Sequence, residues 1–281
     1  MEFLDAYCAR IGYTGPRTPT LDTLRALQQL HPAAIPFEAV DVLLDRPVLL
    51  APEVVDDKLI RARRGGYCFE QNSLFQRVLS ALGFQVESLI AQVQWMAGPE
   101  ALQRPRTHMV LRVTVDGQPW LCDVGFGGCV LTAPIRFDLQ TPQPTPHERY
   151  RLTPVGNEHL LELQWEEGED WLPVYLISPA PCRSGDYLMA NYYSSTYPES
   201  RFRHDLIVAR TTAATRYALL NNRLTIRHAV GGSERRFLSA DELELALAEV
   251  FRLPVTPDWR PLIDRIAATV WDEQPGSRSG S

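Results

Sequence analysis

The chain of 281 residues is predicted to fold as an α+β protein whose helices and strands occupy separate regions. Two observations support this fold class. Apolar residues recur at helical spacing in the first third, whereas apolar and polar residues alternate in the middle, as in half-buried strands. The last third combines both patterns. Helices, then strands, then a small mixed unit favour segregated elements over an alternating β-α-β arrangement.

Four helices are expected in the first third. One contains Leu21, Leu24 and Leu27 at helical spacing. The next begins with Pro52, which suits a first helical turn because its missing N–H would have no helical partner there. The last carries an apolar stripe and ends at Gly83. The expected ranges are 3–13, 20–31, 51–63 and 68–83.

Six strands are expected in the middle of the chain, where the apolar period changes to two. Six consecutive strands separated by turns predict a barrel or a strongly twisted sheet. A proline-rich stretch, residues 132–148, is expected to be a long loop. The expected strand ranges are 84–95, 108–115, 119–126, 148–154, 159–165 and 171–177.

The last third is expected to contain further strands within residues 216–237, joined at Asn221-Asn222 and at Gly231-Gly232. Ser239 and Glu242 form a capping box that predicts a helix over the following residues. This helix is expected at 242–251, and a final helix is expected at 259–271. Residues 276–281 have the composition of an appended tail and are excluded from the fold.

Composition excludes several classes of function. The net charge of 28 − 34 = −6 disfavours a nucleic-acid partner. No apolar run approaches the roughly 18 residues of a membrane span, and the first residues lack the pattern of a secretory signal. The five cysteines include no C-x-x-C pair, which disfavours a disulfide framework or a metal site. Free thiols indicate a reducing, cytoplasmic location.

The stretch RRGGYCFEQN places Cys68 directly after a flexible turn of two glycines and a tyrosine, at the start of an expected helix. A free thiol with a pKa of about 8.5 is only a few per cent thiolate at neutral pH. The N–H groups and positive dipole end of a helix favour the anion, and a neighbouring imidazolium would favour it further. Cys68 is therefore a candidate nucleophile, with simple core packing as the alternative.

His108 can be placed relative to an acid through a predicted hairpin. Asp116-Gly117 is typical of a two-residue loop, and in that register facing residue numbers sum to 233. His108 and Asp123 then lie on one face as diagonal neighbours, although a slip of one residue would separate them. The opposite face is apolar and consists of Met109, Leu111, Val113, Trp120, Cys122 and Val124.

This hairpin supplies what a nucleophile, a base and an orienting acid require. Asp123 would fix the tautomer of His108, and the imidazolium would hold Cys68 as thiolate. In the alternative interpretation, His108 begins a strand by chance and Asp123 caps its end. The spacing by itself leaves both open.

Three motifs, RGGYCFEQN, THMVLRV and DVGFG, together resemble those of the arylamine N-acetyltransferases. The opening segment from Ala9 to Leu44 and the later YYSSTYPESRF extend the resemblance over roughly residues 3–230. It implies a helical bundle that carries the nucleophile, an antiparallel β-barrel that carries the His and Asp, and an α/β lid. The first two resemble the core of papain-like cysteine proteases. The implied ranges are 1–84, 85–190 and 191–275.

The resemblance implies a ping-pong acetyltransferase of xenobiotic metabolism. Cys68 corresponds to the nucleophile, His108 to the base and Asp123 to its orienter. The thiolate would take the acetyl group of acetyl-coenzyme A, the cosubstrate, and pass it to an arylamine, hydrazine or arylhydroxylamine. No metal is implied.

The resemblance also implies binding residues. Phe37, Tyr67, Phe126 and Phe202 correspond to positions around the acceptor, where apolar walls suit an aryl ring. Thr107 lies where the family approaches the pantetheine arm. Ala39 departs from the family, which usually has Asn there, and is expected to require only a local adjustment.

Two other functions are compatible with these residues. A Cys-His-Asp amide synthase, cyclase or hydrolase could use the same core, and a binding module could retain the triad without catalysis. The natural amine, the acyl chain and the oligomeric state are not specified by any pattern in the sequence.

Overall fold

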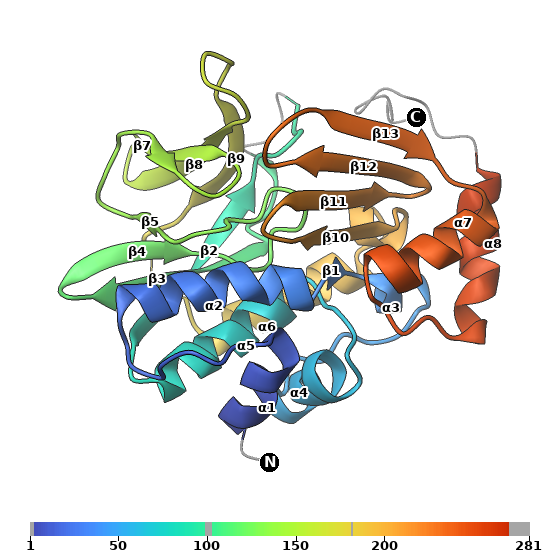
Figure 1. Ribbon diagram of the computed structural model, residues 1–281, viewed down its shortest axis with the longest axis horizontal. Coiled ribbons are helices and arrows are strands. Elements are labelled where there is room, and N and C mark those ends of the chain that lie inside the picture. Colours follow the sequence, from blue (N-terminus) through green and yellow to red (C-terminus); the bar gives the residue numbers. More distant parts are fainter. Residues whose placement is uncertain (1–2, 99–102, 181, 270–281) are drawn as a thin grey trace.

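The computed structural model describes residues 3–98, 103–180 and 182–269. Within them, the strands form an eight-stranded and a five-stranded antiparallel sheet, with helices packed below and beside them. Figure 1 shows the early helices gathered at the base, the larger sheet on one side and the smaller sheet with the last helices on the other. The predicted α+β class is confirmed. Parts of two predictions, the last residues of the final helix and the tail 276–281, lie outside the described residues.

The early helices follow the predicted pattern with shifted ends. Thr20 caps the second helix by accepting the N–H of Thr23 at 3.3 Å. The helix expected at 51–63 is instead a short α-helix that continues as a π-helical turn. Their bounds are α1 Phe3–Ile11, α2 Leu21–Ala34, α3 Val40–Leu43, α4 Pro52–Asp56, η1 Asp57–Arg61 and α5 Cys68–Ala81.

Helix α5 lies in the centre of the first core. Its stripe of Phe75, Val78 and Leu79 is fully buried, as predicted. The apolar face of the hairpin, including Met109 and Leu111, belongs to the same core. This packing brings the helix that starts with a cysteine against the strand that starts with a histidine.

The eight-stranded sheet is a nearly closed antiparallel barrel with the order β5-β4-β3-β2-β9-β8-β7-β6. Its strands are β2 Gln85–Val93, β3 His108–Val115, β4 Gln118–Cys122, β5 Ile135–Arg136, β6 Gln143–Pro144, β7 Arg149–Val155, β8 Glu158–Gln164 and β9 Leu172–Ile177. The six predicted strands agree with these bounds to within two residues at each end, except that strand 119–126 stops at Cys122.

The predicted loop 132–148 is wrong in part, because it contains the edge strands β5 and β6. Each has two residues, too few for an alternating pattern. The side chain of Gln143 accepts the N–H of Arg136 at 2.6 Å and donates to its carbonyl at 2.9 Å. The side-chain amide of Gln143 therefore makes the two hydrogen bonds to Arg136 that a neighbouring strand would make, and it links the two edges of the barrel.

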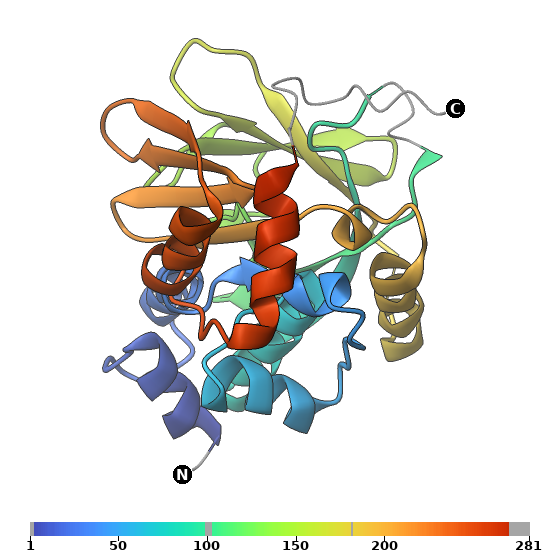
Figure 2. The ribbon, with the colours of Figure 1, turned by 90° about the vertical axis from the view of Figure 1, so that its right-hand side faces the viewer.

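The five-stranded sheet forms the α/β lid with the last helices. Figure 2 shows α7 and α8 packed across this sheet, and their apolar side chains form a core with it. The turn at Asn221-Asn222 and the capping box of Ser239 are confirmed. The elements are β1 Phe37–Glu38, β10 Ile207–Thr211, β11 Thr215–Leu220, β12 Arg223–His228, β13 Ser233–Phe237, α7 Ala240–Leu245, η4 Ala246–Val250, η5 Pro257–Trp259 and α8 Arg260–Ala268.

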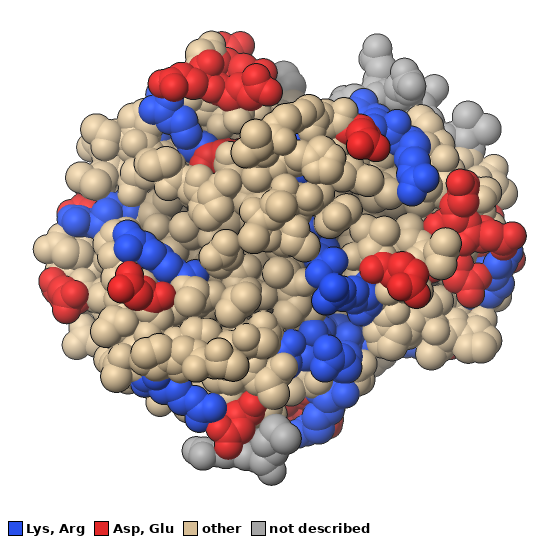
Figure 3. All heavy atoms as spheres, in the orientation of Figure 1, with Lys and Arg blue, Asp and Glu red and all other residues tan. Residues whose placement is uncertain are grey.

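Two of the contacts that attach the lid to the first part of the chain involve β1 and the end of α2. Strand β1 pairs with β10, although it lies among the early helices in sequence. At the end of α2, buried Arg10 donates to the carbonyl of Ala34, and Arg210 of the lid donates to that of Ala33 at 2.7 Å. A guanidinium is favoured beside the negative end of a helix. Figure 3 shows basic side chains gathered in a band on this face, where α2 ends below β10.

Helix α6 Ser184–Thr196, followed by the 3₁₀ turn η3 Arg201–Arg203, was not predicted from the sequence. The implied boundary between residues 190 and 191 falls within α6, and the three-part division by residue number stays a prediction. Among the described residues, no helix has the length and apolar character required to span a bilayer.

Candidate active site

The two glycines before Cys68 allow the chain to pack tightly on both sides. A Cβ on Gly65 would lie 2.2 Å from the carbonyl oxygen of Pro36, and one on Gly66 would lie 2.7 Å from the carboxylate of Glu70. Real Cβ contacts do not come so close. The turn therefore requires residues without side chains in order to enter α5 beside β1.

Cys68 is the first residue of α5, and its side chain is almost fully buried at 4% exposure. Glu70 accepts the backbone N–H of Tyr67 at 3.0 Å, which satisfies one of the free donors at the helix start. The Sγ atom lies 3.5 Å from the carbonyl oxygen of Thr107, the residue before His108. The nucleophile candidate and the start of β3 are therefore in direct contact.

A buried network of charges holds both ends of the glycine turn. Lys58 Nζ lies 2.7 Å from Asp41 and 2.8 Å from Glu70, and Arg64 Nη2 lies 2.8 Å from Glu38 and 3.1 Å from Asp41. Burial opposes the charge on Lys58, but the surrounding carboxylates raise its pKa above the ordinary value. Opposite charges alternate through the network, so each buried ion has a partner.

At Ala39, where the family usually has Asn, the neighbouring Glu38 supplies the acceptor for the start of α3. The N–H of Val40 donates to Glu38 Oε2 at 2.8 Å, and Ala39 makes no side-chain cap for α3. The backbone donor at the start of α3 is satisfied without an amide at position 39, and that this departure leaves activity intact stays a prediction.

The predicted hairpin register is confirmed. Val115 pairs with Gln118, and the ladder continues to Leu111 and Cys122, with the facing sum of 233 throughout. The extension of that ladder to His108 was wrong, because β4 ends at Cys122 and Asp123 lies just beyond it. The face that carries His108 is also more buried than predicted, since Val110 belongs to the barrel core.

His108 and Asp123 are in contact inside the protein. His108 Nε2 lies 2.7 Å from Asp123 Oδ2, and the two residues are 2% and 0% exposed. Asp123 Oδ1 accepts two further hydrogen bonds, from Asn72 Nδ2 at 2.9 Å and from the N–H of Gly125 at 2.8 Å. Each carboxylate oxygen therefore has a donor.

These contacts set the charges of the pair. Burial by itself would raise the pKa of Asp123, but the charge of His108 and the hydrogen bonds from His108, Asn72 and Gly125 lower it overall. Burial would lower the pKa of His108, but the charge of Asp123 and hydrogen bonds with Asp123 and Cys68 raise it to about 10. The imidazolium is therefore the favoured form at neutral pH.

The contact with Asp123 assigns the two nitrogens of His108. Because Nε2 donates to the carboxylate, Nδ1 is the nitrogen left for the side chain of Cys68, with which His108 also interacts. The structure thus brings together the three residues that the sequence proposed as nucleophile, base and orienter, in that spatial order.

The predicted aromatic residues lie in two neighbouring groups. Phe202 packs on Phe37 and Tyr67, with ring centroids 6.2 Å and 5.5 Å apart. Phe126 packs edge-on against His108 at 5.0 Å. The groups meet at Gly127, where a Cβ would lie 3.4 Å from the ring of Phe37. Phe126, Phe202 and Thr107 are partly exposed, and so they lie between the buried triad and the surface.

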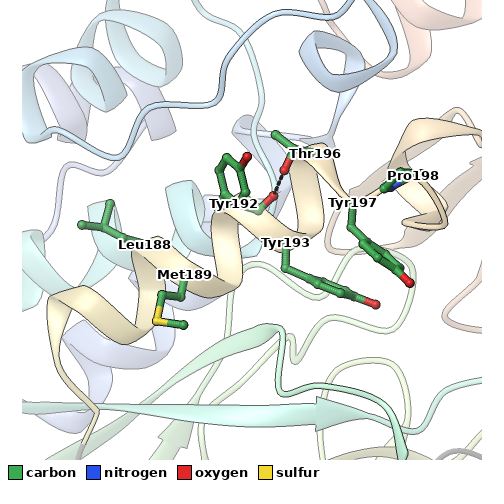
Figure 4. Close-up of a pocket in the computed structure, with 7 residues that line it drawn as sticks. All are labelled: Leu188, Met189, Tyr192, Tyr193, Thr196, Tyr197 and Pro198. Atoms are coloured by element: carbon green, nitrogen blue, oxygen red, sulfur yellow. Dashed lines mark hydrogen bonds between the residues drawn. The ribbon is translucent and has the colours of Figure 1, made fainter.

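Helix α6 supports this aromatic group from its inner face. The hydroxyl of Tyr67 donates to the side chain of Asn191, which in turn donates to the carbonyl of Val48 at 2.9 Å. The outer face of α6 has a shallow hollow of about 510 Å³, in which Tyr193 and Tyr197 stack at 4.6 Å (Figure 4). The predicted site residues do not line this hollow.

Sequence reasoning missed several residues of the site. Asn72 could have been found, because it lies one helical turn after Cys68 and must share its face. Tyr175, whose ring lies 4.9 Å from that of His108, could not, because β9 joins the sheet beside β2 from far along the chain. The same holds for Asn191.

Comparisons with known proteins identify the family. Residues 20–260 match a family model described as N-acetyltransferase. An arylamine N-acetyltransferase of Escherichia coli K12 is 45% identical over 207 residues, which are 74% of this chain and 72% of that protein. One of Mycolicibacterium smegmatis is 42% identical over 252 residues, 88% of this chain and 90% of that protein.

Solved structures extend the similarity to the fold. The arylamine N-acetyltransferase of Mycobacterium marinum in complex with CoA superposes with a TM-score of 0.88 at 37% identity, covering 94% of this chain and 99% of that one. That of Mycobacterium tuberculosis has a TM-score of 0.88 at 38% identity, with the same coverage. The chain belongs to the arylamine N-acetyltransferase family of acyltransferases.

Proposed function

We propose that the chain transfers the acetyl group of acetyl-coenzyme A to arylamines, arylhydrazines or arylhydroxylamines through an acetyl-Cys68 intermediate. The observation that carries this proposal is the buried contact of His108 with Asp123, next to the point where Cys68 Sγ meets the carbonyl of Thr107, the residue before His108. An imidazolium held in this way stabilises a thiolate, which is the reactive form of cysteine. The complex of the Mycobacterium marinum relative with CoA supports the choice of donor.

In the first half-reaction, Cys68 Sγ attacks the thioester carbonyl, and the bond from that carbon to the sulfur of coenzyme A breaks. The departing sulfur takes the proton that His108 holds on Nδ1. The donor and product are both thioesters, so this exchange needs little driving force. Asp123 remains ionised and keeps the imidazole oriented throughout.

In the second half-reaction, the nitrogen of the amine attacks the acetyl carbon. His108, now neutral at Nδ1, accepts the proton of the amine, and Cys68 leaves again as thiolate beside the imidazolium. An amide replaces a thioester, which makes this step downhill. The enzyme returns to its starting charge state.

We propose that Phe37, Tyr67, Phe126 and Phe202 bind the aryl ring of the acceptor, and that Thr107 lies along the path of the donor. The two ring contacts of Phe202, with Phe37 and with Tyr67, join these three residues into one apolar wall. Such a wall binds a flat ring through area and edge-to-face contacts. It also limits the access of water to the thioester, which a transferase requires.

The test is to mix the protein with acetyl-coenzyme A, first alone and then with an aniline. We expect one equivalent of coenzyme A to be released rapidly without amine, an acetyl group on the peptide that contains Cys68, and steady turnover only with amine. Cys68→Ser should abolish the burst, whereas Cys182→Ser, which removes a partly exposed thiol away from the triad, should not.

Other outcomes would identify the alternative functions. Steady release of coenzyme A without amine would indicate a hydrolase. A product that forms only when the amine and the acyl group belong to the same molecule would indicate a cyclase. A burst that persists in Cys68→Ser would contradict the proposed nucleophile.

A further inference from the structure

We propose that Asn72 is a positioning residue that sets the distances among Cys68, His108 and Asp123. This inference rests on the proposed function, because it assigns a role within that site. Asn72 touches none of the reacting atoms. It acts by joining the three chain segments that supply them.

Asn72 is connected to all three segments. It lies on α5, four residues and about one helical turn after Cys68. Its Nδ2 donates to Asp123 Oδ1 at 2.9 Å and to the carbonyl of Met109, the residue after His108, at 2.7 Å. Its Oδ1 accepts the N–H of Val124 at 3.1 Å. Each hydrogen bond thus ends within one residue of a triad member.

Only an amide of this size satisfies these contacts. Met109 and Asp123 offer acceptors, whereas Val124 offers a donor, so the side chain must donate twice and accept once. Asn72 is fully buried, so bulk water does not compete for these hydrogen bonds. The fit is tight, since a Cβ on Gly125 would lie 2.9 Å from Asn72 Nδ2.

The arrangement connects the position of the acid to the position of the nucleophile. Asp123 lies on a segment beyond the end of β4, outside the ladder that fixes β3 to β4. Without Asn72, that segment would be held to α5 by packing alone. A shift of about 1 Å in a catalytic group can reduce turnover by about 100-fold.

Two variants test the inference. Asn72→Ala removes all three hydrogen bonds. Asn72→Asp keeps the shape and the acceptor for Val124 but replaces the donor to Asp123 by a second carboxylate. Gln28→Ala is the matched control, because Gln28 is also a fully buried amide, on α2, whose hydrogen bond goes to Leu131 rather than to the triad.

The readouts are kcat and KM for acetyl-coenzyme A, and the rate at which iodoacetamide labels Cys68 as a function of pH. We expect Asn72→Ala to lower kcat by about 100-fold with little change in KM, and to move the labelling profile toward higher pH. Asn72→Asp should be similarly slow at neutral pH and recover partly on acidification, because a protonated carboxyl can again donate to Asp123.

Gln28→Ala should lose stability in urea but keep the wild-type kcat and labelling profile. If Asn72→Asp folds and both its kcat and its labelling profile match the wild type, the positioning role is refuted while the proposed function stands. If wild-type Cys68 itself shows no preferential labelling and no acetylation, the proposed function fails first. These two failures are therefore distinguishable.

Discussion

Replacing Asp123 by asparagine removes one charge while keeping the shape of the side chain. In the structure, Oδ1 of Asp123 accepts hydrogen bonds from Asn72 and from the N–H of Gly125, and Oδ2 accepts one from His108. The two groups that donate to Oδ1, Asn72 and the N–H of Gly125, will hold the amide oxygen of the new side chain in that place. Its NH₂ group must then face His108 Nε2, which becomes an acceptor.

This exchange reverses the tautomer of His108. With Nε2 accepting, the proton of the neutral ring moves to Nδ1, the nitrogen that serves Cys68. The ring can then no longer accept the proton of the thiol. The thiolate loses its counter-ion, and the first half-reaction loses its nucleophile.

The magnitude follows from the pKa of His108. Its rise from the ordinary 6.5 to about 10 corresponds to about 5 kcal/mol in favour of the imidazolium. That value is the net effect of burial, which opposes the charge, and of Asp123 and Cys68, which favour it, so it sets the scale of the interaction rather than the share of Asp123. An analogous loss of the acid in serine-protease triads costs about 10⁴ in kcat. We therefore expect Asp123→Asn to slow acetylation of the enzyme by about 10³- to 10⁴-fold.

The assay is stopped-flow release of coenzyme A from acetyl-coenzyme A without amine, with urea unfolding to show that the variant is folded. Asp138→Asn is the control, because Asp138 pairs with Arg136 at the surface. A folded Asp123→Asn variant that acetylates itself within tenfold of the wild-type rate would refute the role of Asp123.

Three further predictions follow from the same structure. Iodoacetamide near pH 7 should label Cys68 first, because burial raises the pKa of the other four thiols, and equal labelling of Cys182, the most accessible of them, would contradict this. Burial lowers the pKa of His31 to about 4, although the hydrogen bond that its Nε2 donates to Gln71 opposes this shift. The unfolded chain therefore takes up this proton first as pH falls below 6.5. Between pH 7 and pH 5, the free energy of unfolding of the wild type should fall by about 2 kcal/mol more than that of His31→Gln, measured by urea titration. Parallel curves for the two proteins would disprove this. Gly125→Ala should cost about 1–3 kcal/mol and most of the turnover, because the new Cβ would lie 2.8 Å from the Cα of Cys68, whereas Gly185→Ala, with open space around it, should cost little.

Features that depend on neighbouring residues were predictable from the sequence. Helix α5 has a full apolar stripe, and the hairpin of β3 and β4 has a two-residue turn that fixes its register. That turn places the ends of the two strands near each other, and so it predicted that His108 and Asp123 would be neighbours, although the ladder stops before them. The lid turns and the capping box of Ser239 were predictable for the same reason, since turn and cap chemistry act over two to four residues.

Features that depend on residues far apart in the chain were not predictable from the sequence. Strand β1 has only two residues and gains its structure by pairing with β10, about 170 positions later. The edge strands β5 and β6 are joined by a side chain. Helix α6 exposes apolar side chains such as Met189 and Tyr192, so its sequence lacks a clear polar face.

The sequence by itself determined a helix that starts with a cysteine and a hairpin that brings a histidine toward an aspartate. Only the tertiary structure decided that these two units meet. Their contact depends on the packing of α5 against β3, on glycines at 65, 66 and 125 that permit close approach, and on the amide of Asn72. Periodicity and turn chemistry describe one segment at a time, whereas a distance between segments is fixed by the interactions across their interface.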